Sequence, residues 1–148
     1  MRILFVCTGN TCRSPMAEGI FKKIIAEKKM KNIVCESAGI AAAEGFPASP
    51  NAVQVCKEIG VDISQHRAQR LLGEKLKNYD IFAVMTQEHA HLLKAAGVPK
   101  EKIRVLGNQI PDPFGGGIAI YRECREKLFV ALVELASEIE LKTGGQNA

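Results

Sequence analysis

The sequence is poor in large aromatic side chains and has no long apolar segment. Its 148 residues include no tryptophan, two tyrosines and six phenylalanines. The apolar stretch near the beginning, residues 3–6, is too short for the hydrophobic region of a signal peptide, and no other run approaches the ~20 residues needed to span a bilayer. We therefore expect a cytoplasmic protein that does not bind a membrane.

Concentrated positive charge and metal-ligand clusters are also missing. The formal net charge is +4, and the basic residues are scattered along the chain, so nucleic acid is not a predicted partner. A small positive excess suits a site that binds anions. His89 and His91 have no obvious third ligand, and their spacing in a predicted helix places them on different faces. We expect no metal and no cofactor.

Disulfide bonds are not expected. The five cysteines are an odd number, and a chain of this length with 47% apolar residues can bury a core without covalent cross-links. Cys35, Cys56 and Cys124 are interpreted as small core residues. No linker, repeat or low-complexity tract divides the chain, so one domain is predicted over residues 1–142, with a frayed polar tail over 143–148.

Strand and helix signals alternate along the chain. Short apolar runs typical of strands buried on both faces occur at residues 2–6, 33–35, 81–85 and 103–106. Helix signals follow them, starting at Ser14-Pro15 and Ser49-Pro50 and covering residues 87–96 and about 118–141. The alternation predicts an α/β protein of three layers, a four-stranded parallel sheet with helices on both faces. Ligands of such folds bind beyond the carboxyl ends of the strands.

The loop after the first predicted strand carries the strongest chemical signal. It reads Cys7-Thr8-Gly9-Asn10-Thr11-Cys12-Arg13-Ser14 and leads from a strand end into a helix start. Backbone N–H groups at such a position converge on a bound anion and also favour the thiolate form of Cys7. Arg13 can turn back and hold two phosphate oxygens with its planar guanidinium. The combination favours a phosphate-binding loop with Cys7 as nucleophile over an inert buried cysteine.

Three further loop residues have predicted roles. Gly9 permits a tight turn, and Asn10 is one of the few types other than glycine that tolerate left-handed backbone angles. Ser14 could cap the following helix, donate a hydrogen bond to the Cys7 sulfur, or do both. A hydroxyl near the sulfur would help the thiolate leave when a phospho-cysteine is hydrolysed.

Asp112 is the candidate general acid. It lies in a loop rich in proline and glycine before the last predicted helix, in the segment Asp112-Pro113-Phe114. Attack by a thiolate expels a poor leaving group, which needs a positioned acid to protonate it. An ordinary turn built on Asp-Pro and the glycines that follow stays open as an alternative.

These motifs, together with Ser37-Ala38-Gly39 and His66-Arg67-Ala68, resemble the low-molecular-weight protein phosphatase family over nearly the whole chain. The resemblance implies Cys7 as nucleophile, Arg13 as the transition-state ligand and Asp112 as general acid. It also implies a supporting hydrogen-bond network of Asn10, Ser14, Ser37 and His66. At Cys12 it implies a second thiol that can trap the nucleophile in a reversible disulfide, with a passive loop residue as the alternative.

Within that family the sequence resembles the protein-arginine phosphatases at three positions. Thr11 stands where tyrosine-directed members commonly carry isoleucine, Phe114 where they usually carry tyrosine, and Thr86 where many members carry an acidic residue. The resemblance implies phosphorylated proteins as partners, with phosphoarginine as the favoured substrate, phosphotyrosine as the alternative and inorganic phosphate as product. The smaller Thr11 could leave room for a planar guanidinium and help position the water that attacks phospho-cysteine.

Two other functions compete with a phosphatase. Arsenate reductase can share this fold and a similar anion loop, but it passes a disulfide along further cysteines, and none lies between Cys56 and Cys124. A phosphoprotein-binding module without catalysis would need only the anion loop. The presence of a nucleophile, an arginine and a candidate acid favours an enzyme over that module.

Overall fold

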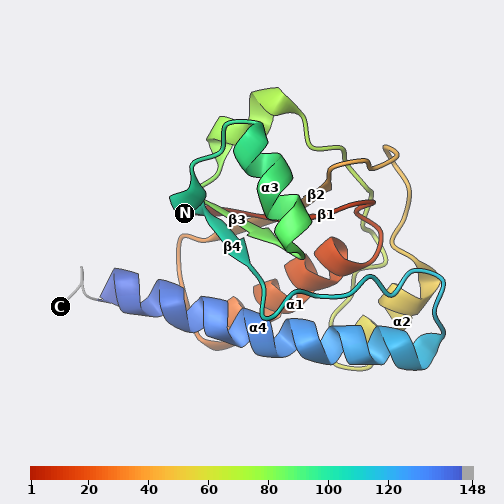
Figure 1. The fold of residues 1–148 in the computed structure, drawn as a ribbon. Coiled ribbons are helices and arrows are strands. Elements are labelled where there is room, and N and C mark those ends of the chain that lie inside the picture. Colours follow the sequence, from red (N-terminus) through yellow and green to blue (C-terminus); the bar gives the residue numbers. More distant parts are fainter. Residues whose placement is uncertain (145–148) are drawn as a thin grey trace.

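The computed structural model describes residues 1–144, which contain a four-stranded sheet in the order β2-β1-β3-β4 (Figure 1). The strands are β1 (Arg2–Cys7), β2 (Val34–Gly39), β3 (Ile81–Val84) and β4 (Ile103–Val105). All three strand pairings are parallel, with β1 hydrogen-bonded to both β2 and β3. The predicted parallel α/β fold is confirmed.

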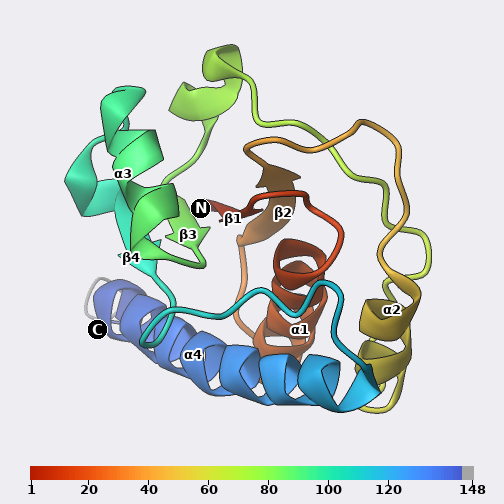
Figure 2. The same cartoon turned by 45° about the vertical axis from the view of Figure 1, so that its right-hand side comes forward.

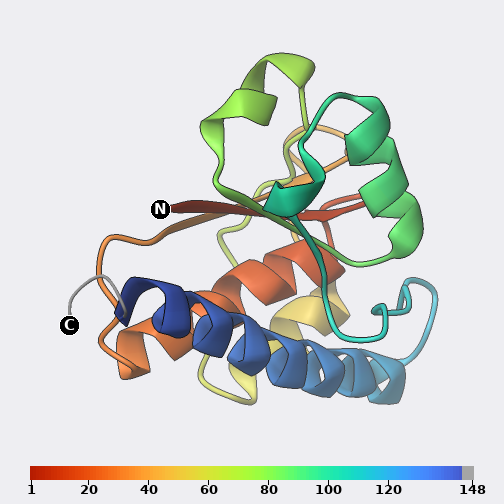
Figure 3. The same ribbon diagram turned by 60° about the vertical axis from the view of Figure 1, so that its left-hand side comes forward.

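Helices cover both faces of this sheet. On one face lie α1 (Arg13–Glu27), α2 (Pro50–Lys57) and α4 (Ile118–Gly144), and on the other lies α3 (Gln87–Ala95), as Figure 3 shows with the sheet nearly edge-on. Two short 3-10 helices, Gly73–Asn78 and Lys100–Lys102, were not apparent in the sequence pattern. The three predicted layers are therefore present.

The alternating side chains of β1 supply both halves of the core. Ile3 and Phe5 are fully buried in the cluster that includes α1 and α4, where Phe5 meets Phe21 edge to face at a centroid distance of 5.5 Å. Leu4 and Val6 point to the other face and pack with residues of β3 and α3. Because β1 is central and buried on both faces, its carboxyl end is a rigid base for the loop that follows.

The helix boundaries differ in places from those predicted. α1 begins at Arg13 after Cys12, two residues before the expected first helical residue Pro15, so Ser14 is not its cap. Ser49 does cap α2, since its hydroxyl accepts a hydrogen bond from the Ala52 N–H at 3.4 Å. α4 continues through Gly144, beyond the predicted end of the domain at 142, and the rest of the predicted tail, 145–148, lies outside the described residues.

The described helices include none with the length and apolar character required of a membrane span.

The end of β2 packs unusually closely against the loop after β1. Cys7 and Gly39 are paired in register at the carboxyl ends of β1 and β2. A Cβ atom on Gly39 would lie 2.6 Å from the Thr8 carbonyl oxygen and 2.9 Å from the Asn10 backbone nitrogen. Both of these are backbone atoms, so they cannot move aside as the tip of a flexible side chain could. Glycine at this position therefore allows the two strand ends to meet.

We expect Gly39→Ala to lower the free energy of unfolding by about 1–3 kcal/mol, the usual cost of overpacking, and to reduce catalysis by displacing the loop. Urea denaturation followed by circular dichroism measures the stability. Gly73→Ala is the matched control, because nothing lies within 4 Å of the Cβ it would add. Equal stability of the two variants would contradict this account of Gly39.

Candidate active site

The loop between β1 and α1 is held by backbone hydrogen bonds from several directions. Behind it, the Ala41 N–H donates to the Thr8 carbonyl at 2.9 Å and the Ser49 N–H donates to the Thr11 carbonyl at 2.8 Å. Figure 2 shows the loop at the junction of β1 and α1, with the segment after β4 crossing in front of the start of α1. These bonds set the shape of the loop independently of any ligand.

The Cys7 sulfur lies inside this loop. Its Sγ atom is 2.9 Å from the Ser14 hydroxyl and accepts a hydrogen bond from the Asn10 N–H at 3.3 Å. The side chain of Cys7 is buried, as is that of Ser14. Of the two roles predicted for Ser14, the structure supports contact with the sulfur and excludes the cap. The sulfur is therefore contacted by a backbone N–H and by a hydroxyl inside the loop.

Asn10 is the hub of the buried network behind the sulfur. Its φ of 56° is left-handed, as its residue type suggested. Its Nδ2 donates to Ser14 Oγ at 2.7 Å and to Ser37 Oγ at 3.0 Å, and its Oδ1 accepts from the Gln69 N–H at 2.9 Å. His66 Nε2 lies 2.8 Å from the Asn10 carbonyl oxygen. The four residues that the resemblance linked therefore lie in one network, and Gln69 is an additional member.

The network has an acidic end that the sequence pattern did not reveal. The Ser37 hydroxyl donates a hydrogen bond to Glu18 Oε1 at 2.7 Å. Glu18 lies in α1 and Ser37 in β2, so this bond ties the helix that follows the loop to the neighbouring strand. No local motif marks Glu18, because its importance depends on where β2 runs in the fold.

Arg13 connects the loop to the candidate acid. The Arg13 side chain is only 5% exposed, and its Nη1 donates to the Ile110 carbonyl at 3.0 Å. Its Nη2 lies 3.7 Å from Asp112 Oδ2. Asp112 also accepts a hydrogen bond from the Phe114 N–H at 3.1 Å, which is the turn that was considered as the alternative. The turn and the approach to Arg13 coexist, since the turn uses one carboxylate oxygen and the arginine faces the other.

The predicted substrate-facing residues differ in how far solvent reaches them. Phe114 is 77% exposed and Asp112 is also exposed, so solvent reaches both side chains. Thr11 is partly exposed. Gly9 does not take a left-handed conformation, and the positive φ of the loop falls on Asn10 instead.

Cys12 occupies a polar niche beside the loop. Its sulfur lies 3.3 Å from the Tyr121 hydroxyl and 3.4 Å from the Ser49 hydroxyl. Burial, reinforced by the contact with Cys12, raises the pKa of Tyr121 to about 12, so the phenol keeps its proton. Cys12 is therefore anchored to α4 and to the cap of α2. The predicted pairing of Cys12 with Cys7 would require it to leave these partners.

The remaining cysteines are core residues, as predicted. All five cysteines are free thiols. Burial raises the pKa values of Cys35, Cys56 and Cys124 to about 12, which keeps these three thiols protonated and unreactive at neutral pH. They do not compete with the loop cysteines as nucleophiles.

His89 is a residue near the site that the sequence reasoning set aside as a possible metal ligand. Its Nε2 lies 3.0 Å from the Thr8 hydroxyl, and its side chain is buried in the first turn of α3. Burial, with a smaller contribution from the charge of Arg13, lowers the pKa of His89. Over residues 1–144 no group of three or more His, Cys, Asp or Glu side chains could hold a metal ion. Only its position in the fold could have indicated a role for His89. It follows the end of β3, which lies next to β1 in the sheet.

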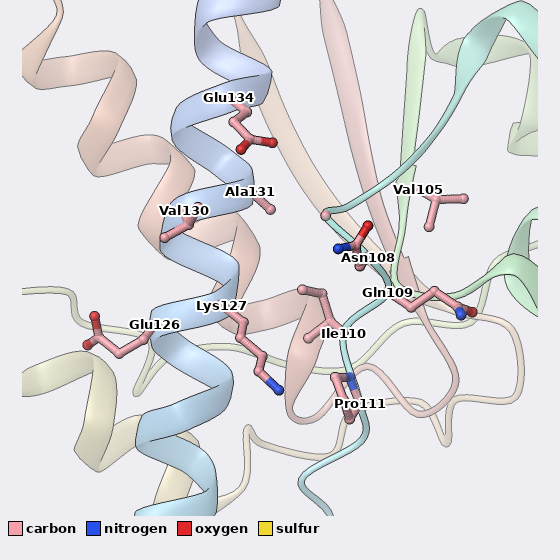
Figure 4. A pocket seen from close by; sticks show the side chains of 11 residues that line it. Val105, Asn108, Gln109, Ile110, Pro111, Glu126, Lys127, Val130, Ala131 and Glu134 are labelled. Atoms are coloured by element: carbon pink, nitrogen blue, oxygen red, sulfur yellow. The ribbon is translucent and has the colours of Figure 1, made fainter.

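A surface cavity of about 730 Å³ lies beside this site and not in it (Figure 4). One wall is the segment after β4, including Ile110 and Pro111, and the other is the middle of α4, including Lys127 and Val130. None of the residues of the Cys7 loop lines it. We therefore place the candidate site at the loop, which holds Cys7 and from which Arg13 reaches toward Asp112.

Comparison with known proteins agrees with this geometry. Residues 2–145 match the model of the family described as low molecular weight phosphotyrosine protein phosphatase. A protein-arginine-phosphatase of Bacillus subtilis (strain 168) is 36% identical, with 95% of this chain and 97% of that protein covered. A probable low molecular weight protein-tyrosine-phosphatase, EpsP of Ralstonia nicotianae, is 45% identical, with 85% of this chain and 87% of that protein covered.

A solved structure is similar over almost the whole chain. It is a cysteine-to-serine mutant of the YwlE arginine phosphatase with a phosphorylated active-site serine. It superimposes with a TM-score of 0.88 at 34% identity and covers 95% of this chain and 96% of that one.

We expect Asn10→Ala to lower the free energy of unfolding by at least about 1–3 kcal/mol, because Ser37 Oγ and the Gln69 N–H would lose a buried partner. Thermal and urea unfolding measure the change. Asn108→Ala, at an exposed position of the loop after β4, is the control and should change stability little. If Asn10→Ala were no more destabilising than Asn108→Ala, Asn10 would not be the hub described here.

Proposed function

The chain belongs to the low molecular weight phosphotyrosine protein phosphatase family, and on that premise we propose that it hydrolyses phosphoarginine residues of proteins. Membership makes the chain a cysteine-dependent protein phosphatase. We propose two further points: which phosphorylated amino acid is the substrate, and which role each residue of the site has. The observation that supports it most directly is the buried Cys7 sulfur in the loop that leads into Arg13, whose guanidinium lies 3.7 Å from the Asp112 carboxylate.

The reaction proceeds in two displacements. The Cys7 thiolate attacks phosphorus, the P–N bond breaks, and Asp112 gives its proton to the departing guanidine nitrogen. Arg13 and the loop N–H groups hold the phosphoryl oxygens as charge develops on them. A water molecule then attacks the phospho-cysteine, Asp112 takes up its proton, and inorganic phosphate leaves with the thiolate restored. The Ser14 hydroxyl, 2.9 Å from the sulfur, stabilises that leaving thiolate.

Phosphoarginine is favoured over phosphotyrosine for two reasons. Thr11 is smaller than isoleucine and carries a hydroxyl at a partly exposed place in the loop, where it can neighbour a planar guanidinium. In its protonated form, Asp112 can accept a hydrogen bond from the guanidinium of the substrate through one oxygen and give the proton on its other oxygen to the departing nitrogen. Two curated relatives that carry the name protein-arginine-phosphatase, at 36% and 37% identity, add support. Thr86, the third position of resemblance, caps α3 by accepting the His89 N–H at 3.2 Å.

Phosphotyrosine is the second candidate substrate. The relative EpsP is more identical to this chain than the arginine-directed relatives, although the alignment covers less of it. We also propose that Cys12 can trap Cys7 in a disulfide under oxidation, which would switch the phosphatase off reversibly. A cytoplasmic location, where such a disulfide would be reduced again, fits this regulation.

We expect Asp112→Asn to lower kcat on a phosphoarginine peptide by about 10²–10⁴-fold, the usual contribution of a general acid, while peptide binding is largely retained. Asp62→Asn is the matched control, because Asp62 also accepts a backbone N–H two residues ahead in an exposed turn. Single-turnover kinetics with detection of released phosphate gives the rate of phosphate release for Asp112→Asn and for the control Asp62→Asn. Unchanged turnover in Asp112→Asn would remove it from the acid role, and absence of any phosphate release in the wild type would indicate a binding module.

We expect Thr11→Ile to lower the ratio of kcat/KM for phosphoarginine to kcat/KM for phosphotyrosine, measured side by side on two peptides of otherwise identical sequence. Thr11→Val is the informative companion, because it removes the hydroxyl at nearly constant volume. If the ratio changes in Thr11→Ile alone, the small volume of Thr11 accounts for the selectivity. If the ratio changes in both variants, the hydroxyl accounts for it. An unchanged ratio in both variants is incompatible with Thr11 as the selectivity residue.

A further inference from the structure

His89 and Thr8 form a contact between two neighbouring strand ends that the proposed reaction leaves unexplained. Thr8 follows the nucleophile at the end of β1, and His89 lies in the first turn of α3, after the end of β3. Thr86, the cap of this helix, accepts the His89 N–H, which fixes the backbone from which the imidazole extends. Nε2 of the ring then reaches the Thr8 hydroxyl at 3.0 Å. The cap therefore fixes the His89 backbone, and the imidazole extends from it to the Thr8 hydroxyl in the loop.

Among residues 1–144, one polar group contacts the His89 imidazole. The His89 side chain is 5% exposed, and its Nδ1 atom is buried without a hydrogen-bond partner. A buried N–H without an acceptor is rarer and more costly in proteins than a buried acceptor without a donor. The favoured neutral tautomer therefore has its proton on Nε2 and a bare Nδ1. In that tautomer the histidine donates and the Thr8 oxygen accepts.

The charges around the ring favour the same neutral form. Arg13 and burial both oppose an imidazolium, whereas Glu88 of the same helix and Asp112 favour it more weakly. Protonation would also place an N–H on Nδ1, where it has no acceptor. The ring therefore stays neutral near pH 7.

Thr8 differs from most of the loop in being open to solvent. Cys7, Asn10, Cys12, Arg13 and Ser14 are buried, while Thr8 is exposed and Thr11 partly exposed. The Thr8 hydroxyl is therefore accessible to a group that binds at the surface of the loop. The Thr8 carbonyl accepts the Ala41 N–H, so the backbone of this residue is fixed as well.

We infer that His89 is a positioning residue, which donates its Nε2 proton to the Thr8 hydroxyl and thereby turns the Thr8 hydroxyl proton outward as a donor to the phosphoryl group of the substrate. A hydroxyl that already accepts from His89 has its own proton free, and a phosphoryl oxygen is the strongest acceptor that reaches the loop. The inference rests on the phosphatase reaction of this site but not on the choice of phosphoarginine.

The test uses substrates that do not depend on that choice. For para-nitrophenyl phosphate as substrate and inorganic phosphate as competitive inhibitor, we expect Thr8→Val and His89→Leu each to raise KM and the inhibition constant about three- to tenfold, the effect of one hydrogen bond. We expect kcat to change less than about twofold. His91→Leu, at an exposed position two residues along the same helix, is the control and should change neither constant.

Two comparisons separate positioning from a structural role. His89→Gln keeps an amide N–H near the position of Nε2 and should restore both constants nearly to wild type. The double variant of Thr8→Val and His89→Leu should be no weaker in binding than Thr8→Val alone, because His89 acts through that hydroxyl. Three results would each overturn the inference. The losses of binding in Thr8→Val and His89→Leu could add up in the double variant, His89→Gln could bind as weakly as His89→Leu, or Thr8→Val could bind phosphate as tightly as the wild type.

Nitrogen-15 NMR of the histidine rings gives a readout that needs no variant of His89. We expect His89 in the neutral tautomer with its proton on Nε2 at pH 7. A proton on Nδ1 would refute the inference, because the Thr8 hydroxyl would then have to donate to His89 and could not donate to the substrate. This measurement decides the matter even if His89→Leu does not fold. Lack of activity on phosphoarginine peptides would leave all of these readouts intact.

Discussion

The geometry of the site depends on one left-handed residue, Asn10, and on the four partners of its side chain and carbonyl. At φ of 56° the chain turns so that the Asn10 N–H faces the Cys7 sulfur. The amide side chain is meanwhile buried among Ser14, Ser37 and the Gln69 backbone. An asparagine in this conformation is sterically tolerable, but its buried amide is costly unless every group is paired. The groups that pair with the Asn10 side chain therefore stabilise the turn. The turn directs the Asn10 N–H at the Cys7 sulfur.

Much of this arrangement could be predicted because its causes are local. The strand before Cys7, the cap of α2 at Ser49 and the left-handed Asn10 follow from short patterns and residue types, and the structure agrees with each. The family resemblance was confirmed for the same reason, since the loop motif is contiguous. Of the roles left open for Ser14, the helix cap is wrong because α1 starts at Arg13, two residues before the expected first helical residue Pro15. The Ser14 hydroxyl lies against the Cys7 sulfur instead.

Other parts of the site could not be predicted because they join distant segments. Gln69, Glu18, His89 and Tyr121 contact the loop or its network only through the fold, and no short motif marks any of them. The contact of Arg13 with the Ile110 carbonyl is of the same kind, since 97 residues separate the two in sequence. The necessity of Gly39 likewise becomes clear only when β1 and β2 are in register, with the Thr8 carbonyl 2.6 Å from the place of a Cβ.

Arg13 links the Cys7 loop to the segment after β4 through two contacts of unequal strength. One nitrogen of its guanidinium is bound to the Ile110 carbonyl deep in the structure, while another faces Asp112 at 3.7 Å near the surface. The outer contact is the weaker one, because the Asp112 side chain is 53% exposed and an exposed ion pair contributes at most about 1 kcal/mol. A phosphoryl group can therefore take over that nitrogen without disturbing the buried bond. Asp112 would then be released from Arg13 and could turn toward the leaving group instead.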